Sequence, residues 1–323
     1  MMHFTLQVKP FSFRLTKKLI ASNGEISLKV GWLIKLQDNL GRLGWGEISP
    51  LNYSEREICE KILKGLGETP SREVLEKGIK EWPGALSFGI GAALAELEGQ
   101  FASGDEQEWL TAPNSAFLLP TNNLVLDSLD YFLEKFKKHT GILTFKWKVA
   151  NQSTSKEHTI LHQILNRLPS NARIRIDANG GWNRHQAEEW ASKLKEERKL
   201  EWLEQPLSGE DIEGLVSLSK QVPVALDESL RINQSLKAEW KGWQIRRPSL
   251  DGDPRILLDE LRSGVTHRAI STAFETGIGL RWVHYLATLQ QKTTTPTAPG
   301  LAPGWSPSGN LFNKNPKIVW EAV

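Results

Sequence analysis

The chain of 323 residues is too long for one ordinary core, and it predicts either two domains or one large α/β barrel with an addition. Its 40 Lys and Arg residues nearly balance its 38 Asp and Glu residues, and no long run of one charge occurs, which argues against nucleic acid as a partner. The single cysteine, Cys59, excludes an internal disulfide framework and Cys-based zinc sites.

The targeting features of the sequence predict a cytoplasmic protein. The N-terminus alternates like a strand and lacks the apolar block of a signal peptide. No stretch approaches the roughly 18–20 consecutive apolar residues needed to cross a bilayer, so no membrane partner is expected. A lone cysteine also suits a reducing compartment. The oligomeric state stays open.

The first hundred residues predict a layer of antiparallel strands followed by helices. Alternating segments at 4–15, 26–38 and 43–51 are separated by turn signals, and residues 54–104 have a helical pattern. The stretch GIGAALAEL, at 89–97, lacks the Lys-Ser/Thr of a phosphate loop. Its small residues therefore indicate close helix packing.

A strand–helix alternation begins near residue 114. Amphipathic stretches separate several of the short apolar strands, which indicates βαβ units and a parallel sheet. At least seven such units without a nucleotide-binding glycine signature favour a closed (β/α) barrel. The predicted strands are 115–120, 143–150, 173–179, 200–206, 222–229, 242–250 and 268–276.

The last part of the chain changes composition again. Residues 293–309 are rich in Pro and Gly, and residues 310–323 are expected to form a last strand that returns to the N-terminal layer. The predicted domains are a capping domain at 1–107, a barrel at 108–305 and a C-terminal segment at 306–323 that returns to the capping domain.

Charged residues mark the ends of four consecutive predicted barrel strands. Lys148, Asp177, Glu204 and Asp227 follow one another at intervals of 23 to 29 residues, about one βα unit each. Reactive groups of such barrels lie at the carboxyl ends of the strands. Since neighbouring strands lie ~5 Å apart, the three acids are expected to converge.

Three converging carboxylates need a neutralising charge, because like charges at this range raise each other's pKa. A hard divalent cation provides it, and Mg²⁺, with Mn²⁺ as an alternative, prefers oxygen ligands. The sequence therefore predicts Asp177, Glu204 and Asp227 as metal ligands. The competing interpretation is that each acid only caps a helix or pairs with an arginine.

Lys146 and Lys148 alternate with apolar residues in LTFKWKVA, so both are expected on the inward face of one strand. A neighbouring positive charge and partial burial lower the pKa of a lysine, as a general base near neutrality requires. Lys148, nearest the mouth, is the predicted base. The alternative, that both lysines simply pair with the acids, stays open.

These motifs resemble the enolase superfamily, in particular its members with Lys-x-Lys on the second barrel strand. The similarity covers nearly the whole chain and includes GWGEISPL, ALSFGIGAALAEL, IRIDANGGW, LEWLEQP and VALDES. The resemblance implies an α+β capping domain and a modified (β/α)7β TIM-type barrel. It also implies a Lys or His base with bound magnesium, a known property of that superfamily.

Within the superfamily, SFGIGAALAEL, RIDAN, RPSL and AISTAFETGIGL resemble the o-succinylbenzoate synthase family most. That resemblance implies a lyase that dehydrates 2-succinyl-6-hydroxy-2,4-cyclohexadiene-1-carboxylate in menaquinone or phylloquinone biosynthesis. Lys148 would remove the α-proton to give an enediolate and then protonate the departing hydroxyl. The alternatives are a dipeptide epimerase, an N-acylamino acid racemase or a cycloisomerase of the same superfamily, and a non-catalytic metal-binding barrel.

The same resemblance assigns residues that orient the substrate or hold its succinyl portion. Arg175 and Asn179 share a face with Asp177, and further contacts are expected from Ser271, Thr272, Glu275 and Gly277.

One departure from the superfamily pattern concerns the residue before Pro248. Arg247 occupies the position where the superfamily places a lysine, although the register of Arg246 against Arg247 stays open. Because arginine stays protonated, it cannot act as a second base. Arg247 can still supply positive charge or a cation–π contact, so the substitution argues against epimerisation and is compatible with a one-sided dehydration.

Overall fold

The structure is a computed structural model that describes residues 4–21, 24–100 and 112–323. Its residues fall into two compact units. The first unit contains the described residues up to Pro113 together with Arg246–Thr266 and Ile270–Val323. The second contains Asn114–Ile245 and His267–Ala269. The predicted boundary at residue 107 lies outside the described residues, and the predicted boundary at 305 stays a prediction.

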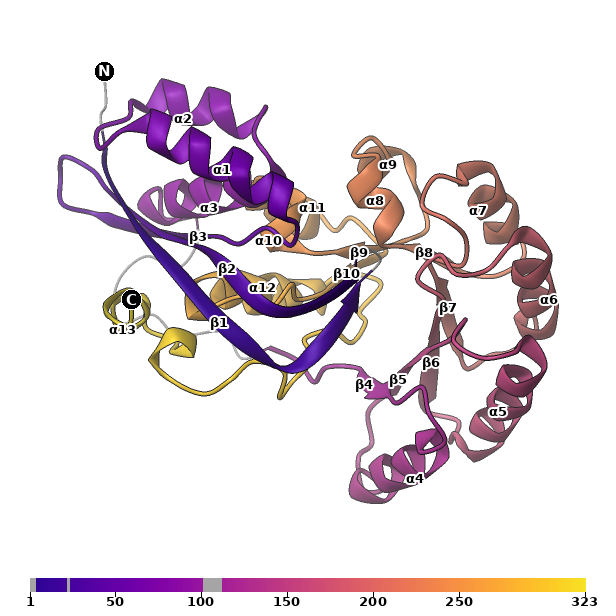
Figure 1. Cartoon of the computed structure of the whole chain (residues 1–323). Coiled ribbons are helices and arrows are strands. Elements are labelled where there is room, and N and C mark those ends of the chain that lie inside the picture. The colour runs from indigo at the N-terminus through magenta and orange to yellow at the C-terminus, as the bar shows by residue number, and fades with distance from the viewer. Residues whose placement is uncertain (1–3, 22–23, 101–111) are drawn as a thin grey trace. The chain divides into compact units, whose positions relative to one another are not determined.

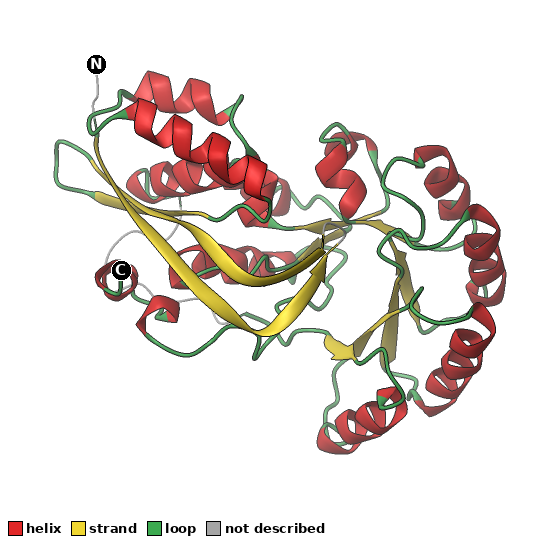
Figure 2. Cartoon of the chain, viewed as in Figure 1, coloured by secondary structure: helices red, strands yellow, loops and turns green. Residues whose placement is uncertain are grey.

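The first unit begins with a three-stranded antiparallel sheet of order β1-β2-β3, as the alternation of the sequence predicted (Figures 1 and 2). Its other elements are helices, of which η1 is a 3₁₀ helix. In chain order the unit contains β1 (Thr5–Ala21), β2 (Gly24–Gln37), β3 (Leu43–Ile48), α1 (Tyr53–Leu66), α2 (Arg72–Ile79), α3 (Gly84–Leu97), α10 (Pro248–Asp251), α11 (Pro254–Arg262), α12 (Gly277–Gln290), η1 (Asn310–Phe312) and α13 (Pro316–Glu321).

Helix α3 packs against β3 at backbone distance, which confirms the packing interpretation of its small residues. A Cβ atom on Gly46 would lie 2.0 Å from the carbonyl oxygen of Gly89, and one on Gly44 would lie 2.0 Å from that of Ala93. Glycine is therefore required on β3 because only a hydrogen atom fits between strand and helix.

The expected C-terminal strand is wrong, because residues 310–323 form η1 and α13 instead. Asn315 caps α13 by accepting a hydrogen bond from the Lys317 amide, and Pro316 takes the first helical position, where its missing N–H costs nothing. Lys9 of β1 donates from Nζ to the carbonyl oxygens of Trp320 and Val323 at 2.9 and 2.8 Å.

The second unit contains most of a seven-stranded sheet of order β10-β9-β8-β7-β6-β5-β4, in which neighbours from β4 to β9 pair in parallel. This confirms the predicted parallel barrel-type sheet. Its elements are β4 (Phe117–Leu119), α4 (Val125–Lys135), β5 (Leu143–Lys148), α5 (Thr154–Arg167), β6 (Ala172–Asp177), α6 (Arg184–Leu194), β7 (Leu200–Glu204), α7 (Ile212–Ser219), β8 (Val224–Leu226), α8 (Glu228–Ile232), α9 (Leu236–Glu239), β9 (Trp243–Arg246) and β10 (Arg268–Ile270).

Helices α4 to α7 lie along one face of strands β4 to β7 (Figure 1). The main core of the second unit fills that layer with alternate strand residues, among them Phe145, Trp147, Ile174 and Ile176. The opposite face of the strands is left for polar side chains. In the parts of the chain that the structure describes, no helix combines the length and apolar character needed to cross a membrane.

A buried carboxylate ties β3 to the start of α12 inside the first unit. Glu47 accepts hydrogen bonds from the Thr276 amide at 2.9 Å, the Thr276 hydroxyl at 2.5 Å and the Gly279 amide at 3.0 Å. A negative charge near a helix N-terminus is favourable. Burial, however, raises the pKa of Glu47 to about 7; repulsion by Glu275 adds to this, and attraction by Lys29 opposes it.

We predict that Glu47 makes the protein less stable as pH rises. Because its pKa is about 7 in the folded chain against 4.5 for an exposed glutamate, the folded state favours the protonated form. The resulting stability is present below about pH 4.5 and is lost as pH rises through about 7. The free energy of unfolding of wild type relative to Glu47→Gln should fall by about 1–3 kcal/mol across that range.

Chemical denaturation of both proteins at about pH 5 and about pH 7.5 measures this difference. A constant difference between the two proteins at both pH values would contradict the prediction.

Candidate active site

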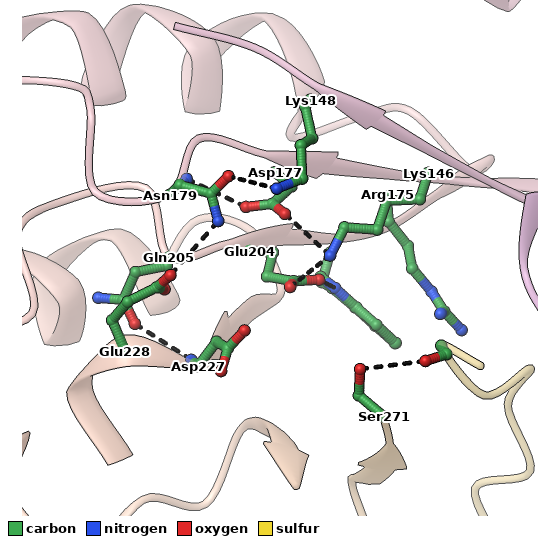
Figure 3. A network of polar contacts seen from close by, with 12 residues as sticks. Lys146, Lys148, Arg175, Asp177, Asn179, Glu204, Gln205, Asp227, Glu228 and Ser271 are labelled. Carbon is green, nitrogen blue, oxygen red and sulfur yellow. Dashed lines mark hydrogen bonds and ion pairs between the residues drawn. The ribbon is translucent and has the colours of Figure 1, made fainter. Parts of the chain in front are cut away.

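Three of the predicted site residues lie side by side at the ends of adjacent strands (Figure 3). Lys148 ends β5 and pairs in register with Asp177, which ends β6, and Asp177 pairs with Glu204, which ends β7. Asp227 follows β8 directly, two residues beyond the Ala225 that pairs with Glu204. The parallel register therefore places these side chains at one edge of the sheet.

The alternation of β5 is as the sequence predicted. Phe145 and Trp147 are buried in the core beneath the helices, and Lys146 and Lys148 project from the other face. One face of β5 therefore packs in the core, and the opposite face carries the two lysines.

Lys146 forms ion pairs with two of the predicted metal ligands. Its Nζ lies 2.8 Å from Asp177 Oδ2 and 2.6 Å from Glu204 Oε1. Burial by itself lowers the pKa of Lys146, but the attraction of Asp177 and Glu204 outweighs burial and raises that pKa. The alternative that the lysines pair with the acids, which the sequence left open, therefore holds for Lys146.

The three acids are almost fully buried, with 1% of Asp177, 1% of Glu204 and 2% of Asp227 exposed. Burial raises the pKa of Glu204, and repulsion by Asp177 and Asp227 adds to this, while Lys146 opposes it. Among the residues that the structure describes, no three His, Cys, Asp or Glu side chains already form a metal-binding cluster.

Lys148 is hydrogen-bonded to Asn179, which in turn is hydrogen-bonded to Glu228. Its Nζ donates to Asn179 Oδ1 at 2.9 Å, and Asn179 Nδ2 donates to Glu228 Oε1 at 3.3 Å (Figure 3). Asn179 has a left-handed backbone with φ of 46°, and its amide donates to Asp177 Oδ1. Burial, together with repulsion by Asp227 and Asp177, raises the pKa of Glu228 to about 7.

Arg175, predicted to orient a ligand, is 3% exposed on β6. Its Nε donates to Glu201 Oε2 at 2.6 Å, and its guanidinium carbon lies 4.1 Å from the ring centroid of Trp202. Both partners come from β7, so the neighbouring strand fixes the orientation of this side chain.

The remaining predicted residues belong to the first unit. Arg247 donates to the Thr272 carbonyl oxygen at 2.7 Å, whereas Arg246 pairs with Asp251 and Glu260 at 2.7 and 2.9 Å. Thr272 and Ser249 donate from their hydroxyls to Glu275, both at 2.5 Å.

Two further predicted residues of the first unit occupy tightly packed positions. Ser271 donates from its hydroxyl to the Gly300 carbonyl oxygen at 3.2 Å. Gly277 begins α12 where a Cβ would lie 1.9 Å from the Asn313 carbonyl oxygen, which explains the glycine by packing.

Sequence reasoning missed two residues that contact or orient the predicted ligands. Trp202 donates from Nε1 to Glu204 Oε2 at 3.2 Å. Gln205, with a left-handed φ of 38°, accepts hydrogen bonds from the backbone amides of Asp227 and Ser229, both at 3.1 Å. The sequence alone could have placed Trp202 beside Glu204, because residues two apart on a strand share a face. It gives no sign that the Gln205 side chain reaches the backbone that follows the next strand.

Comparisons with known proteins agree with this architecture. The Enolase C-terminal domain-like family matches residues 131–238. The o-succinylbenzoate synthase of Thermosynechococcus vestitus BP-1 is 30% identical over 84% of this chain and 85% of its own. A crystal structure of o-succinylbenzoate synthase from Thermosynechococcus elongatus BP-1, complexed with Mg in the active site, has a TM-score of 0.81 and 26% identity, covering 99% of this chain and 100% of that chain.

The L-Ala-D/L-Glu epimerase of Bacillus subtilis, solved with its substrate, has a TM-score of 0.71 at 18% identity and covers 94% of this chain and 91% of that chain, so it shares the fold. The first relative combines 30% identity with coverage of most of both chains. The chain therefore belongs to the o-succinylbenzoate synthase family of the enolase superfamily.

Proposed function

We propose that the protein is an o-succinylbenzoate synthase, a hydro-lyase that converts 2-succinyl-6-hydroxy-2,4-cyclohexadiene-1-carboxylate into o-succinylbenzoate and water. The family relation supports the reaction. The observation that carries the assignment is the register of Lys148, Asp177 and Glu204 across three strand ends, a base beside carboxylates.

Asp177, Glu204 and Asp227 fit a hard divalent cation, Mg²⁺ or Mn²⁺. All three supply buried carboxylate oxygens, and Asp177 Oδ2 has no bond other than its ion pair with Lys146 within the described chain. When bound, the cation would hold the substrate carboxylate and stabilise the negative charge that develops as the α-proton leaves. Lys146 would balance part of the ligands' own charge.

Lys148 performs the proton transfers in this proposal. Its neutral amine takes the α-proton of the substrate, and the resulting ammonium returns a proton to the hydroxyl on the same face. The carbon–oxygen bond then breaks and water leaves, so one lysine suffices for a syn-dehydration. Asn179 holds the Lys148 nitrogen at 2.9 Å and thereby fixes its position.

From the family resemblance we also propose that Ser271, Thr272, Glu275 and Gly277 contact the succinyl portion and that Arg175 orients the substrate or a ligand. Arg247 would supply positive charge or a cation–π contact to the enediolate, since a guanidinium does not act as a base. The epimerase, racemase and cycloisomerase alternatives and the non-catalytic barrel are not favoured, because the relatives with the greater identity are o-succinylbenzoate synthases.

The cellular setting completes the proposal. The single Cys59 supports a cytoplasmic enzyme, and the near balance of charges supports the absence of a nucleic-acid partner. The small carboxylate substrate follows from the family relation, and we propose no membrane partner. The reaction would serve menaquinone or phylloquinone biosynthesis. The capping domain at 1–107, the barrel at 108–305 and the segment at 306–323 remain our proposed domain division.

Divalent metal should control the dehydration. We expect purified protein to form o-succinylbenzoate from the cyclohexadiene substrate with Mg²⁺ and to lose this activity in chelator, as followed by absorbance and mass. A chiral dipeptide in deuterated water with Mg²⁺ serves as the comparison. Rapid exchange and inversion at the α-carbon of that dipeptide, without dehydration of the cyclohexadiene, would contradict the assignment as an o-succinylbenzoate synthase.

Replacement of the proposed base should abolish turnover. Lys148→Ala should lower kcat/KM by about 10³ or more, because the variant lacks the proposed general base. The exposed Lys156 of α5 gives a matched control, and Lys156→Ala should keep the wild-type rate. Dehydration by Lys148→Ala at the wild-type rate would disprove the mechanism.

Lys146 should matter for stability when metal is absent. Lys146→Met leaves two buried carboxylates without their shared cation, so in chelator the free energy of unfolding should fall by about 3 kcal/mol. Lys148→Met removes a hydrogen bond to the neutral Asn179 amide oxygen rather than an ion pair, so it should cost under about 1 kcal/mol. Denaturation midpoints test both, and saturating Mg²⁺ should reduce the Lys146→Met deficit. Equal stability of the two variants in chelator would contradict the prediction.

A further inference from the structure

Trp202 lies beneath the candidate ligand set, two residues before Glu204 on the same strand and therefore on the same face. Its side chain is fully buried. It forms a small cluster with Ala225, Ile245 and Ala269, and its ring centroid lies 4.7 Å from that of Trp243. Packing on this side leaves the indole little freedom to turn.

The indole N–H reaches one oxygen of Glu204. Nε1 donates to Oε2 at 3.2 Å, while the other oxygen, Oε1, receives the Lys146 ammonium at 2.6 Å (Figure 3 shows the Lys146 contact). Each oxygen of this carboxylate thus has its own donor, and the two donors come from different strands. The plane of the carboxylate is fixed by these two contacts together.

The ring face of Trp202 contacts Arg175. The Arg175 guanidinium carbon lies 4.1 Å from its centroid, within the range of a cation–π contact, and Glu201 holds Arg175 Nε from the side. The strand register allows both contacts. Ile174 pairs with Leu200, but Arg175 pairs with Trp202, so Glu201 is an extra residue on β7. Such a bulge re-aims side chains, and here two consecutive residues reach one arginine.

We infer that Trp202 is a positioning residue, whose N–H sets the Glu204 carboxylate for cation binding and whose ring orients Arg175. The inference rests on the proposed function only in taking Glu204 as a metal ligand. Hydrogen-bond partners of ligating groups commonly govern metal affinity, and their loss costs about 10- to 100-fold. Trp202 thereby couples the ligand set to the arginine below it through one rigid side chain.

The test removes the N–H and keeps an aromatic face. Mg²⁺ titration of metal-stripped protein by calorimetry should give a dissociation constant about tenfold higher for Trp202→Phe than for wild type. Trp243→Phe is the matched control, because it makes the same change in the same aromatic pair without a bond to Glu204, and its Mg²⁺ affinity should equal that of wild type. The increase in melting temperature on adding Mg²⁺ provides a second readout.

The outcomes separate this inference from the proposed reaction. Equal Mg²⁺ affinity of Trp202→Phe and wild type overturns the inference even where wild type dehydrates the cyclohexadiene. Weaker Mg²⁺ binding by Trp202→Phe supports it even where wild type fails to dehydrate that substrate. Wild type that binds no Mg²⁺ overturns both the metal assignment and the inference.

A variant that misfolds does not end the test. Benzothienylalanine, incorporated at position 202 alone, keeps the two-ring shape and replaces the N–H by sulfur. The same tenfold loss of Mg²⁺ affinity is expected for that protein, and wild-type affinity would again overturn the inference.

Discussion

The attraction between one lysine ammonium and two buried carboxylates is the interaction on which the rest of the site depends. Lys146 reaches Asp177 and Glu204 from β5, so it links three adjacent strands at their carboxyl ends. Burial raises the pKa of Glu204, and the charges of Asp177 and Asp227 raise it further, while Lys146 opposes both. In the proposed metal site, Lys146 would be the protein's own cation beside the carboxylates that hold the ion.

The two lysines of β5 have different neighbours. Lys146 is bound by carboxylates, which favour its charged form, and such a group does not serve as a base near neutrality. Lys148 contacts the neutral amide oxygen of Asn179 instead. In the proposed mechanism the proton is therefore transferred by Lys148 and not by Lys146.

Sequence reasoning predicted those features that follow from alternation and from strand spacing. The faces of β5, the antiparallel strands near the N-terminus and the parallel sheet follow from local patterns, and the structure confirms them. Whether Lys146 pairs with the acids stayed open, because that depends on carboxylates from two other strands. The C-terminal strand was wrong because Asn315 and Pro316 favour a helix start, a local signal that outweighs apolar alternation. The choice between Arg246 and Arg247 needed partners on α10 and α11 that spacing alone does not identify.

The extra residue on β7 has a consequence for how this chain can vary. Glu201 separates the part of the strand that pairs through Leu200 from the part that pairs through Trp202 and Glu204. If one residue before the bulge is deleted, Glu201 can take its place in the pairing, and the register of Trp202 and Glu204 stays the same. A deletion between Trp202 and Glu204 cannot be absorbed and would invert the carboxylate toward the helices. Length changes among relatives should therefore accumulate before position 201 and be absent from the short stretch after it.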